Sequence, residues 1–367
     1  MRVSAAVVPH VGAPFSVTEV DLDEPRADEV LVQIAGVGLC HTDIAVRDGH
    51  LPFPLPGVLG HEGAGVVVDV GAEVTDLAVG DKVVLSIDSC GDCLNCAQSA
   101  PAYCLQSTRR NFSGARPDGS AALHSQEAAL GSAFFGQSSF ASHALARRRN
   151  AVKLPDDAQI ELMGPLGCGI QTGAGAVMNA LDVRPGLSVL IAGGGSVGLA
   201  ALLAGVVREA GQLIVVEPNP ARRALALELG ATHVIDPAAA DLGKLVRAIA
   251  PAGVTHALDT TAIPTVIESL TRTLGVRGVL GLVGVPADPG AAFSTRMAGF
   301  TMAGRMIRGI VEGDADPQSF IPHLYDLHRQ GRFPFDRLIS TRPLAQINEA
   351  IADQLSGAAV KVVLTPG

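Results

Sequence analysis

The chain has 367 residues, a length that predicts two domains at roughly 100–200 residues each. Asp and Glu number 36 against 27 Lys and Arg, so the formal net charge is −9, and no basic run is long enough to follow a phosphate backbone. Apolar residues make up 48% and charged residues 17%, which excludes disorder as the main state. We expect a folded protein without a nucleic-acid partner.

One stretch, residues 187–207, carries no charge and is as long as a membrane span of about 20 residues. Its three consecutive glycines, Gly193-Gly194-Gly195, favour a buried strand that turns into a buried helix. The N-terminus has no basic flank followed by an unbroken apolar core. We therefore expect no signal peptide, no membrane partner and a cytoplasmic location.

The first 150 residues contain short β-favouring runs separated by Gly, Pro and Asp turns. Residues 30–34 and 65–70 are examples. This texture predicts an all-β region.

From Leu187 onward, apolar strand-like runs alternate with helical stretches, a pattern that predicts crossover units and a parallel sheet. The predicted strands are residues 189–191, 213–216, 233–235, 257–259 and 279–283. Between the second and third, Ala221, Leu225 and Leu229 recur at helical spacing, and Gly230 is placed to end that helix. Residues 332–336 are a predicted connector.

Four of the six cysteines lie close together with the spacing C-x2-C-x2-C-x7-C: Cys90, Cys93, Cys96 and Cys104. A C-x2-C turn places two thiolates on one metal, and four thiolates complete the closed tetrahedral shell of a structural zinc site. A disulfide interpretation needs an oxidising compartment, and an iron–sulfur cluster is a further alternative. The spacing favours zinc.

The other two cysteines, Cys40 and Cys168, lie far apart, and His61 follows Cys40 by 21 residues. Two cysteines and one histidine make a three-ligand zinc set with an open fourth position, which is typical of a catalytic site. A buried cysteine is also commonly a small hydrophobe, and a lone histidine is commonly a satisfied polar group. Taken alone, the three residues leave both interpretations open.

A glycine motif, Gly193-Gly194-Gly195-Ser196-Val197-Gly198, follows an apolar strand and opens a helix. Gly193 permits the tight turn, Gly195 lets a pyrophosphate approach the helix N-terminus, and Gly198 allows close helix–strand packing. Glu217 ends the next strand, where an acidic side chain binds the adenosine ribose hydroxyls of NAD and repels the 2′-phosphate of NADP. The motif therefore predicts NAD.

With these three features together, the chain resembles the zinc-dependent medium-chain alcohol dehydrogenases over essentially its whole length. The benzyl (aryl) alcohol dehydrogenase branch, which also contains enzymes for allylic terpene alcohols, is most similar at residues 110–114, 135–140, 164–176 and 332–336. The resemblance implies an α/β protein with a mainly β second domain. A GroES-like catalytic domain with the structural zinc lobe (1–169, returning at 312–367) would surround a Rossmann NAD-binding domain, a doubly wound parallel sheet (170–311).

By matched position, the resemblance implies that Cys40, His61 and Cys168 hold the catalytic zinc. Glu62 would be an alternative ligand that can approach the metal. Asp43 would hydrogen-bond His61 and so fix the orientation of the imidazole.

The resemblance also implies a proton path that begins at the hydroxyl of Thr42. Many relatives have a histidine at the position of Ala45, so here the proton would leave by water or another group. His50 is one candidate, and a surface loop histidine is the alternative.

Three contacts to the cofactor are implied in the same way: His41 and Lys361 to the pyrophosphate, and Arg222 beside the adenosine ribose. Solvated surface charge is the alternative for all three. The walls of the substrate pocket would include Leu51, Ser86, Phe134 and Phe135, with core packing as the alternative for the two phenylalanines. Ser86 replaces a bulky aromatic residue of other branches, which would admit a ring or a branched allylic chain.

The expected activity is reversible oxidation of an aromatic or allylic primary alcohol, of the benzyl or the geraniol and perillyl type, to its aldehyde with NAD. Two zinc ions per chain and a homodimer or homotetramer are expected with it. Alternatives are oxidation of a thiol adduct, as in glutathione-linked formaldehyde dehydrogenases, and a general medium-chain primary or secondary alcohol dehydrogenase. A zinc-binding structural protein on a retired scaffold would not need the ligand set or the glycine motif.

Overall fold

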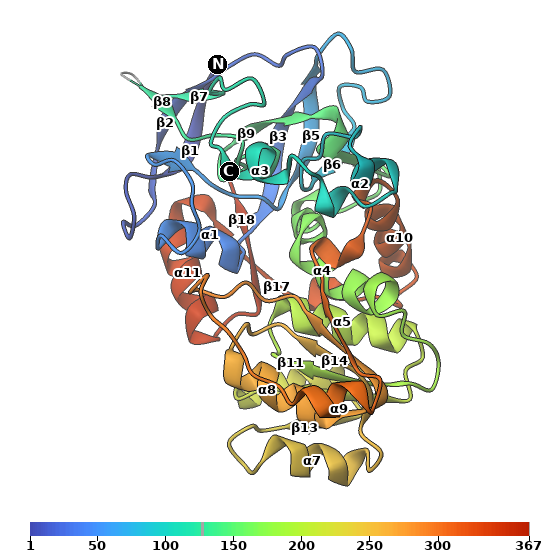
Figure 1. Cartoon of the computed structure of the whole chain (residues 1–367). Helices are drawn as coiled ribbons and strands as arrows, with labels where there is room; N and C mark the ends of the chain where they lie inside the picture. Colours follow the sequence, from blue (N-terminus) through green and yellow to red (C-terminus); the bar gives the residue numbers. More distant parts are fainter. Residues whose placement is uncertain (126–127, 367) are drawn as a thin grey trace. The chain divides into compact units, whose positions relative to one another are not determined.

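The computed structural model describes residues 1–125 and 128–366 and divides into two compact units (Figure 1). The first unit comprises Met1–Cys168, Asp316–Leu327 and Asp336–Gly367. The second comprises Gly169–Ala315 and His328–Phe335.

The first unit is built on two mainly antiparallel sheets. One has the order β4-β1-β2-β7-β8 and consists of β1 (Arg2–Val8), β2 (Ser16–Leu22), β4 (Gly57–Val58), β7 (Leu123–His124) and β8 (Ala129–Leu130). The other has the order β10-β6-β5-β3-β18-β17, with β9 also paired to β3. Its strands are β3 (Glu29–Gly38), β5 (Gly63–Val70), β6 (Lys82–Leu85), β9 (His143–Arg147), β10 (Ala151–Leu154), β17 (Ile339–Pro343) and β18 (Lys361–Thr365).

The central strand β3 is buried along most of its length, because neighbouring strands and core side chains enclose it. Its end at Gly38 pairs with β18, so the last strand of the chain lies beside the segment that leads into Cys40. This pairing brings residues more than 300 positions apart into contact.

The prediction of an all-β region is wrong at three short helices: α1 (His41–Arg47), α2 (Leu94–Ala97) and α3 (Ser107–Phe112). They have 7, 4 and 6 residues, too few to produce the periodic apolar pattern by which a helix is recognised in sequence. The first begins with a local contact, since the backbone N–H of Cys40 donates to Asp43 Oδ2 at 3.0 Å. Two longer helices, α10 (Pro317–Arg329) and α11 (Ile347–Ser356), lie near the C-terminus.

The second unit is built on a parallel six-stranded sheet with the order β13-β12-β11-β14-β15-β16. The five predicted strands are confirmed as β11 (Ser188–Ala192), β12 (Gln212–Val216), β13 (His233–Ile235), β14 (Val254–Asp259) and β15 (Leu274–Leu282). The sixth strand, β16 (Met306–Gly309), was not predicted; its four residues are exposed, so it lacks the buried apolar run that marks the others. The strand order reverses between β11 and β14, and ligands of such sheets bind outside the carboxyl ends of the strands at this point. The sheet is therefore of the Rossmann kind.

The helices of this unit are α4 (Gly169–Gly175), α5 (Ser196–Val207), α6 (Pro220–Glu228), α7 (Leu242–Ile249), α8 (Pro264–Thr273) and α9 (Met297–Thr301). The predicted helix around Leu225 is confirmed as α6, and Gly230 follows it with a φ of +105°. Residues 187–207 form β11 and α5, as expected for a buried strand and helix. In the described part of the chain, a helix with the length and apolar character of a membrane span is absent.

Candidate active site and metal centres

Four side chains of the first unit converge on one point. The ligand atoms of Cys40, His61, Glu62 and Cys168 all lie within 4.8 Å of one another. Cys40 directly precedes α1, His61 and Glu62 directly precede β5, and Cys168 follows a 3-10 turn. The three ligands implied by the resemblance, and the alternative ligand Glu62, are thus brought together.

The imidazole of His61 is fully buried and has one nitrogen held and one nitrogen open. Its Nδ1 donates to Asp43 Oδ1 at 3.0 Å, whereas Nε2 has no hydrogen-bond partner among the described residues. A buried polar atom without a partner is costly unless a ligand satisfies it. The open Nε2 beside two thiols therefore fits a zinc ion, which favours Cys and His ligands.

Asp43 connects two ligands through one carboxylate. Its Oδ1 accepts from the His61 ring and from the backbone N–H of Gly60 at 3.0 Å, and its Oδ2 accepts from the backbone of Cys40. Asp43 is itself fully buried, so these bonds have no competition from solvent. The implied role of Asp43 in orienting His61 matches this geometry.

The electrostatics of the cluster favour an ionised thiol beside a charged imidazole. A hydrogen bond from Cys168 and the nearby His61 hold the pKa of Cys40 well below its usual range, although burial opposes this. Burial lowers the pKa of His61, but the charges of Asp43 and Cys40 outweigh it and raise that pKa well above its usual value. A cation at this position would replace the proton on the imidazole as the partner of the thiolates.

Lys361 lies beside the metal cluster rather than on the surface. Its ammonium Nζ is 2.6 Å from Glu62 Oε2 and 2.7 Å from Oε1, and it donates to the carbonyl of Leu39 at 3.0 Å. Burial raises the pKa of Glu62 to about 7, against the opposing attraction of Lys361. The surface-charge alternative is wrong for Lys361, since its side chain is only 1% exposed.

The sequence analysis missed this ion pair. A signal was present, because Lys361 opens the apolar run Lys361-Val362-Val363-Leu364, and a charge in a buried strand needs a partner. The partner itself could not be read from the sequence, since it lies 299 positions away.

Two aromatic rings enclose the imidazole. Phe135 stacks on His61 with 4.5 Å between ring centroids, and Phe134 meets it edge-on at 5.4 Å. Phe53 and Phe112 pack against Phe134 in turn, at 5.1 and 5.8 Å. Phe134 and Phe135, proposed for the pocket wall, are both buried in the core of the first unit, as their core-packing alternative states. Sequence reasoning missed Phe53 and Phe112, because an isolated phenylalanine gives no local signal.

Leu51 and Ser86 are the other two residues implied for the substrate pocket, and their contacts differ from the ring packing of the phenylalanines on His61. Leu51 is partly buried and packs on the core of the first unit. Ser86 is fully buried, and its hydroxyl donates to the carbonyl of Gly167, next to Cys168, at 2.6 Å. Another residue that the sequence analysis missed, Gln137, donates from Nε2 to the carbonyl of His61 at 2.9 Å.

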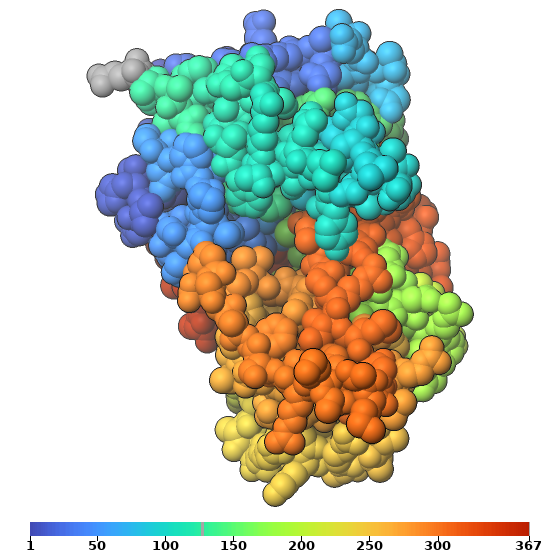
Figure 2. Space-filling model, viewed as in Figure 1, coloured from blue at the N-terminus to red at the C-terminus, as the bar shows by residue number. Residues whose placement is uncertain are grey.

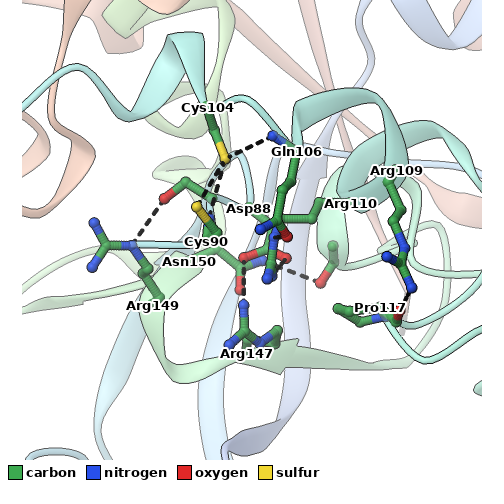
Figure 3. Close-up of polar contacts among 12 residues, drawn as sticks. Asp88, Cys90, Cys104, Gln106, Arg109, Arg110, Pro117, Arg147, Arg149 and Asn150 are labelled. Atoms are coloured by element: carbon green, nitrogen blue, oxygen red, sulfur yellow. Dashed lines mark hydrogen bonds and ion pairs between the residues drawn. The ribbon is translucent and has the colours of Figure 1, made fainter. Parts of the chain in front are cut away.

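The four clustered cysteines form a second group, with all four sulfur atoms within 4.8 Å of one another. Backbone N–H groups donate hydrogen bonds to these sulfur atoms. The N–H of Cys93 donates to Cys90 Sγ at 3.3 Å, and the N–H of Gln106 donates to Cys104 Sγ at 3.4 Å. Figure 3 shows Cys90 and Cys104 beside Gln106. The six cysteines are unpaired thiols, so this group fits a closed tetrahedral metal site and not a disulfide.

The remaining implied residues of the first unit lie on α1. Thr42 Oγ1 is 3.7 Å from Cys40 Sγ, so its hydroxyl lies beside a ligand of the cluster. His41 is exposed at the first position of the helix, and Ala45 follows on the same helix.

The glycine motif lies in the second unit at the carboxyl end of β11. Gly193 has a φ of +102°, and a Cβ on Gly198 would lie 1.9 Å from the carbonyl oxygen of Gly193, so both positions require glycine. Gly195 has open space where a side chain would be, directly before Ser196 and Val197 begin α5. A helix N-terminus with an uncovered backbone fits a phosphate.

Glu217 lies at the carboxyl end of β12, as expected, and the structure adds contacts that the sequence did not indicate. Its Oε2 accepts from the backbone N–H of Gly194 at 2.6 Å, and its Oε1 from that of Asn219 at 2.8 Å. Arg222 lies in the first turn of α6, its backbone N–H directed at the Asn219 side chain. Glu217 therefore touches the glycine motif itself.

Comparison with known proteins decides the family. Residues 26–156 match the model of the alcohol dehydrogenase GroES-like domain, and residues 196–327 match that of the zinc-binding dehydrogenases. The chain is 52% identical over 362 residues to geraniol dehydrogenase of Castellaniella defragrans, covering 98% of this chain and 96% of that protein. It belongs to the zinc-dependent medium-chain alcohol dehydrogenases.

Solved structures of the family agree with this assignment. The benzyl alcohol dehydrogenase of Acinetobacter calcoaceticus superposes with a TM-score of 0.97 at 43% identity, over 100% of both chains. An alcohol dehydrogenase zinc-binding domain protein of Burkholderia ambifaria gives a TM-score of 0.98 at 50% identity, over 100% of this chain and 99% of that one. The GroES-like and Rossmann folds expected from the sequence are confirmed.

Proposed function

We propose that this alcohol dehydrogenase oxidises an aromatic or allylic primary alcohol reversibly to its aldehyde with NAD. The observation that carries the proposal is the set of Cys40, His61 and Cys168, with two phenylalanine rings against the imidazole. Apolar, aromatic surroundings of a metal ligand favour a substrate with a ring or a conjugated chain, which apolar contact can hold. The names of the geraniol and benzyl alcohol relatives support the same class.

The residues divide the work as follows. Cys40, His61 and Cys168 hold the zinc ion, which when bound supplies a Lewis acid that lowers the pKa of the alcohol hydroxyl. Asp43 fixes the imidazole, and the Lys361 ammonium balances the negative charge of Glu62 and of the thiolates nearby.

The proton of the alcohol leaves through the hydroxyl of Thr42, which lies next to Cys40. The methyl group of Ala45 has no hydrogen-bonding atom, so the next acceptor is water. The glycine motif at the start of α5 would hold the pyrophosphate of the cofactor, which when bound would supply a nicotinamide ring as the hydride acceptor.

A screen of NAD reduction across benzyl alcohol, cinnamyl alcohol, geraniol and ethanol tests the proposal. We expect the first three to be oxidised with kcat/KM at least about tenfold above ethanol, as one or more apolar groups in a fitting pocket give about 10–200-fold. Formaldehyde mixed with glutathione tests the alternative function, oxidation of a thiol adduct. NAD reduction with this mixture alone, or no NADH formation with any aryl or allylic alcohol, would refute the proposal.

The cofactor preference follows from Glu217. Its buried carboxylate follows β12 and contacts the glycine motif, the position from which an acidic residue of this fold binds the adenosine ribose and opposes the 2′-phosphate of NADP by like charge. We expect kcat/KM for NAD to exceed kcat/KM for NADP. Glu217→Gln should lower the ratio of the two values, because it removes the charge that repels the 2′-phosphate. Steady-state kinetics with both cofactors check this, and a wild-type preference for NADP would contradict it.

We further propose that the enzyme is a homo-oligomer that pairs through β16. This strand is the last of its sheet, and Met306 and Ile307 on it are exposed. Met297 and Met302, on and just after α9, are 82% and 89% exposed, and the orange segment that contains these elements is uncovered in Figure 2. An exposed sheet edge with apolar side chains favours pairing with a second copy.

Light scattering coupled to gel filtration tests the oligomer. We expect the wild type to be a dimer or tetramer and Ile307→Lys to lower its mass, because a charge would then be buried in the interface. Val79→Lys, at an exposed position of the first unit, is the control and should keep the wild-type mass. A monomeric wild type would contradict the proposal, as would an unchanged mass of Ile307→Lys.

A further inference from the structure

We propose that Asn111 and Phe112 are positioning residues that connect the lobe of residues 90–104, which carries the four clustered cysteines, to the phenylalanine rings packed against His61. Through this connection, the lobe determines the geometry of His61 as a metal ligand and the selectivity for the alcohol. The inference rests on the proposed function, because it assumes that His61 binds the catalytic metal. All residues that carry it belong to the first unit.

The connection begins with a double hydrogen bond between Asn111 and the backbone of Asp88. The N–H of Asp88 donates to Asn111 Oδ1 at 3.0 Å, and Asn111 Nδ2 donates to the carbonyl of Asp88 at 3.0 Å. Asn111 is fully buried. Through this one side chain, α3 is fixed to the segment that leads into Cys90, two residues further on.

The carboxylate of Asp88 strengthens the same junction. It is almost fully buried between two guanidinium groups, with Arg110 Nη1 at 3.1 Å and Arg147 Nη1 at 3.3 Å (Figure 3). Loss of either partner would leave a buried charge uncompensated, so the two ion pairs hold this junction together. Arg110 belongs to α3 and Arg147 to β9, so the junction ties α3 to the sheet in which β9 pairs with β3.

The start of α3 is tied directly to the lobe. The backbone N–H of Gln106 donates to Cys104 Sγ at 3.4 Å, and the helix begins at the next residue, Ser107. The side chain of Asn111 also donates to the carbonyl of Ser107 at 2.8 Å. The six-residue helix is therefore held at its start by a lobe cysteine and near its end by Asp88.

The end of α3 reaches the wall. The ring of Phe112 lies 5.1 Å from that of Phe135, which stacks on His61. A second contact runs through Gly136, where a Cβ would lie 2.7 Å from Asp88 Cβ, so the backbone after Phe135 packs directly on Asp88. Displacing α3 would thus remove one of the ring contacts of Phe135, and contiguous packing of this kind can transmit a shift to the ring that stacks on His61.

The test uses Asn111→Ala and Phe112→Leu in the full-length enzyme, with cobalt replacing zinc at Cys40, His61 and Cys168. The visible absorption of cobalt reports the geometry of its ligands without any substrate. We expect both variants to shift these bands, and to lower the ratio of kcat/KM for benzyl alcohol over ethanol by about tenfold, the scale of a pocket contact.

A matched control is available in Asn348, which makes the same pair of bonds to the backbone of Phe15, at 3.0 and 2.9 Å. We expect Asn348→Ala to leave the spectrum and the selectivity unchanged. If Asn111→Ala fails to fold, Phe112→Leu decides, since leucine keeps an apolar side chain in the core.

Two results separate the possible failures. A folded variant with a lower melting temperature but the wild-type spectrum and selectivity would overturn the inference alone. A wild-type protein that binds no cobalt at Cys40, His61 and Cys168 would refute the proposed function, and the inference with it.

Discussion

Cys168→Ser is expected to abolish alcohol oxidation while leaving the fold intact. The thiol of Cys168 is one of the three proposed zinc ligands, together with the thiol of Cys40 and the open Nε2 of His61. A hydroxyl is a much poorer zinc ligand than a thiolate. We expect kcat/KM to fall by more than about 100-fold, because changes to the groups that merely orient zinc ligands already cost about 10–100-fold. Metal analysis should show loss of one zinc per chain, with the lobe zinc retained.

Asp43→Asn is the milder variant for comparison, because it changes a residue that orients a zinc ligand and not a ligand itself. The variant keeps every ligand but loses the charged partner of the imidazole and one of the two acceptor oxygens of Asp43, so we expect it to retain zinc and to lose about 10–100-fold in activity. Circular dichroism controls for folding in both variants. A Cys168→Ser protein with wild-type activity and zinc content would contradict the assignment.

Cys93→Ala is expected to unfold the lobe before it affects the chemistry. The four sulfur atoms lie close enough together to share one zinc ion, and backbone N–H groups donate to them. Apparent zinc binding to finger peptides contributes roughly 10–16 kcal/mol to folding. We expect loss of one zinc per chain, a clearly lower melting temperature and lower solubility. Calorimetry with metal analysis measures both effects.

Gln98→Ala is the control for the lobe, because Gln98 is exposed beside the same cysteines. It should keep both zinc ions and the wild-type melting temperature. Unchanged melting of Cys93→Ala would show that the lobe does not depend on its metal.

The chemistry-bearing motifs could be predicted because their signals are local. The spacing of Cys90 to Cys104 lies within one lobe, and the glycine motif follows its strand directly. Five of the six parallel strands could be predicted for the same reason, since each is a short apolar run, whereas the exposed edge strand β16 gives no such signal. The three ligands of the other metal set are far apart in the sequence, and only the family resemblance joined them.

What the sequence did not indicate depends on pairings between distant segments. Lys361 meets Glu62 because β18 pairs with β3, and no local pattern contains that pairing. The bond of Asn111 to Asp88 and the stack of Phe135 on His61 arise in the same way, from the packing of short elements. Short helices such as α3 lack the period by which sequence reveals longer ones.

The most direct test is anomalous diffraction from crystals of the zinc-loaded enzyme at the zinc edge. The account predicts two peaks per chain, one among the four lobe sulfurs and one about 2.0–2.3 Å from Cys40 Sγ, Cys168 Sγ and His61 Nε2. A map with density at the lobe but none between Cys40, His61 and Cys168 would contradict it.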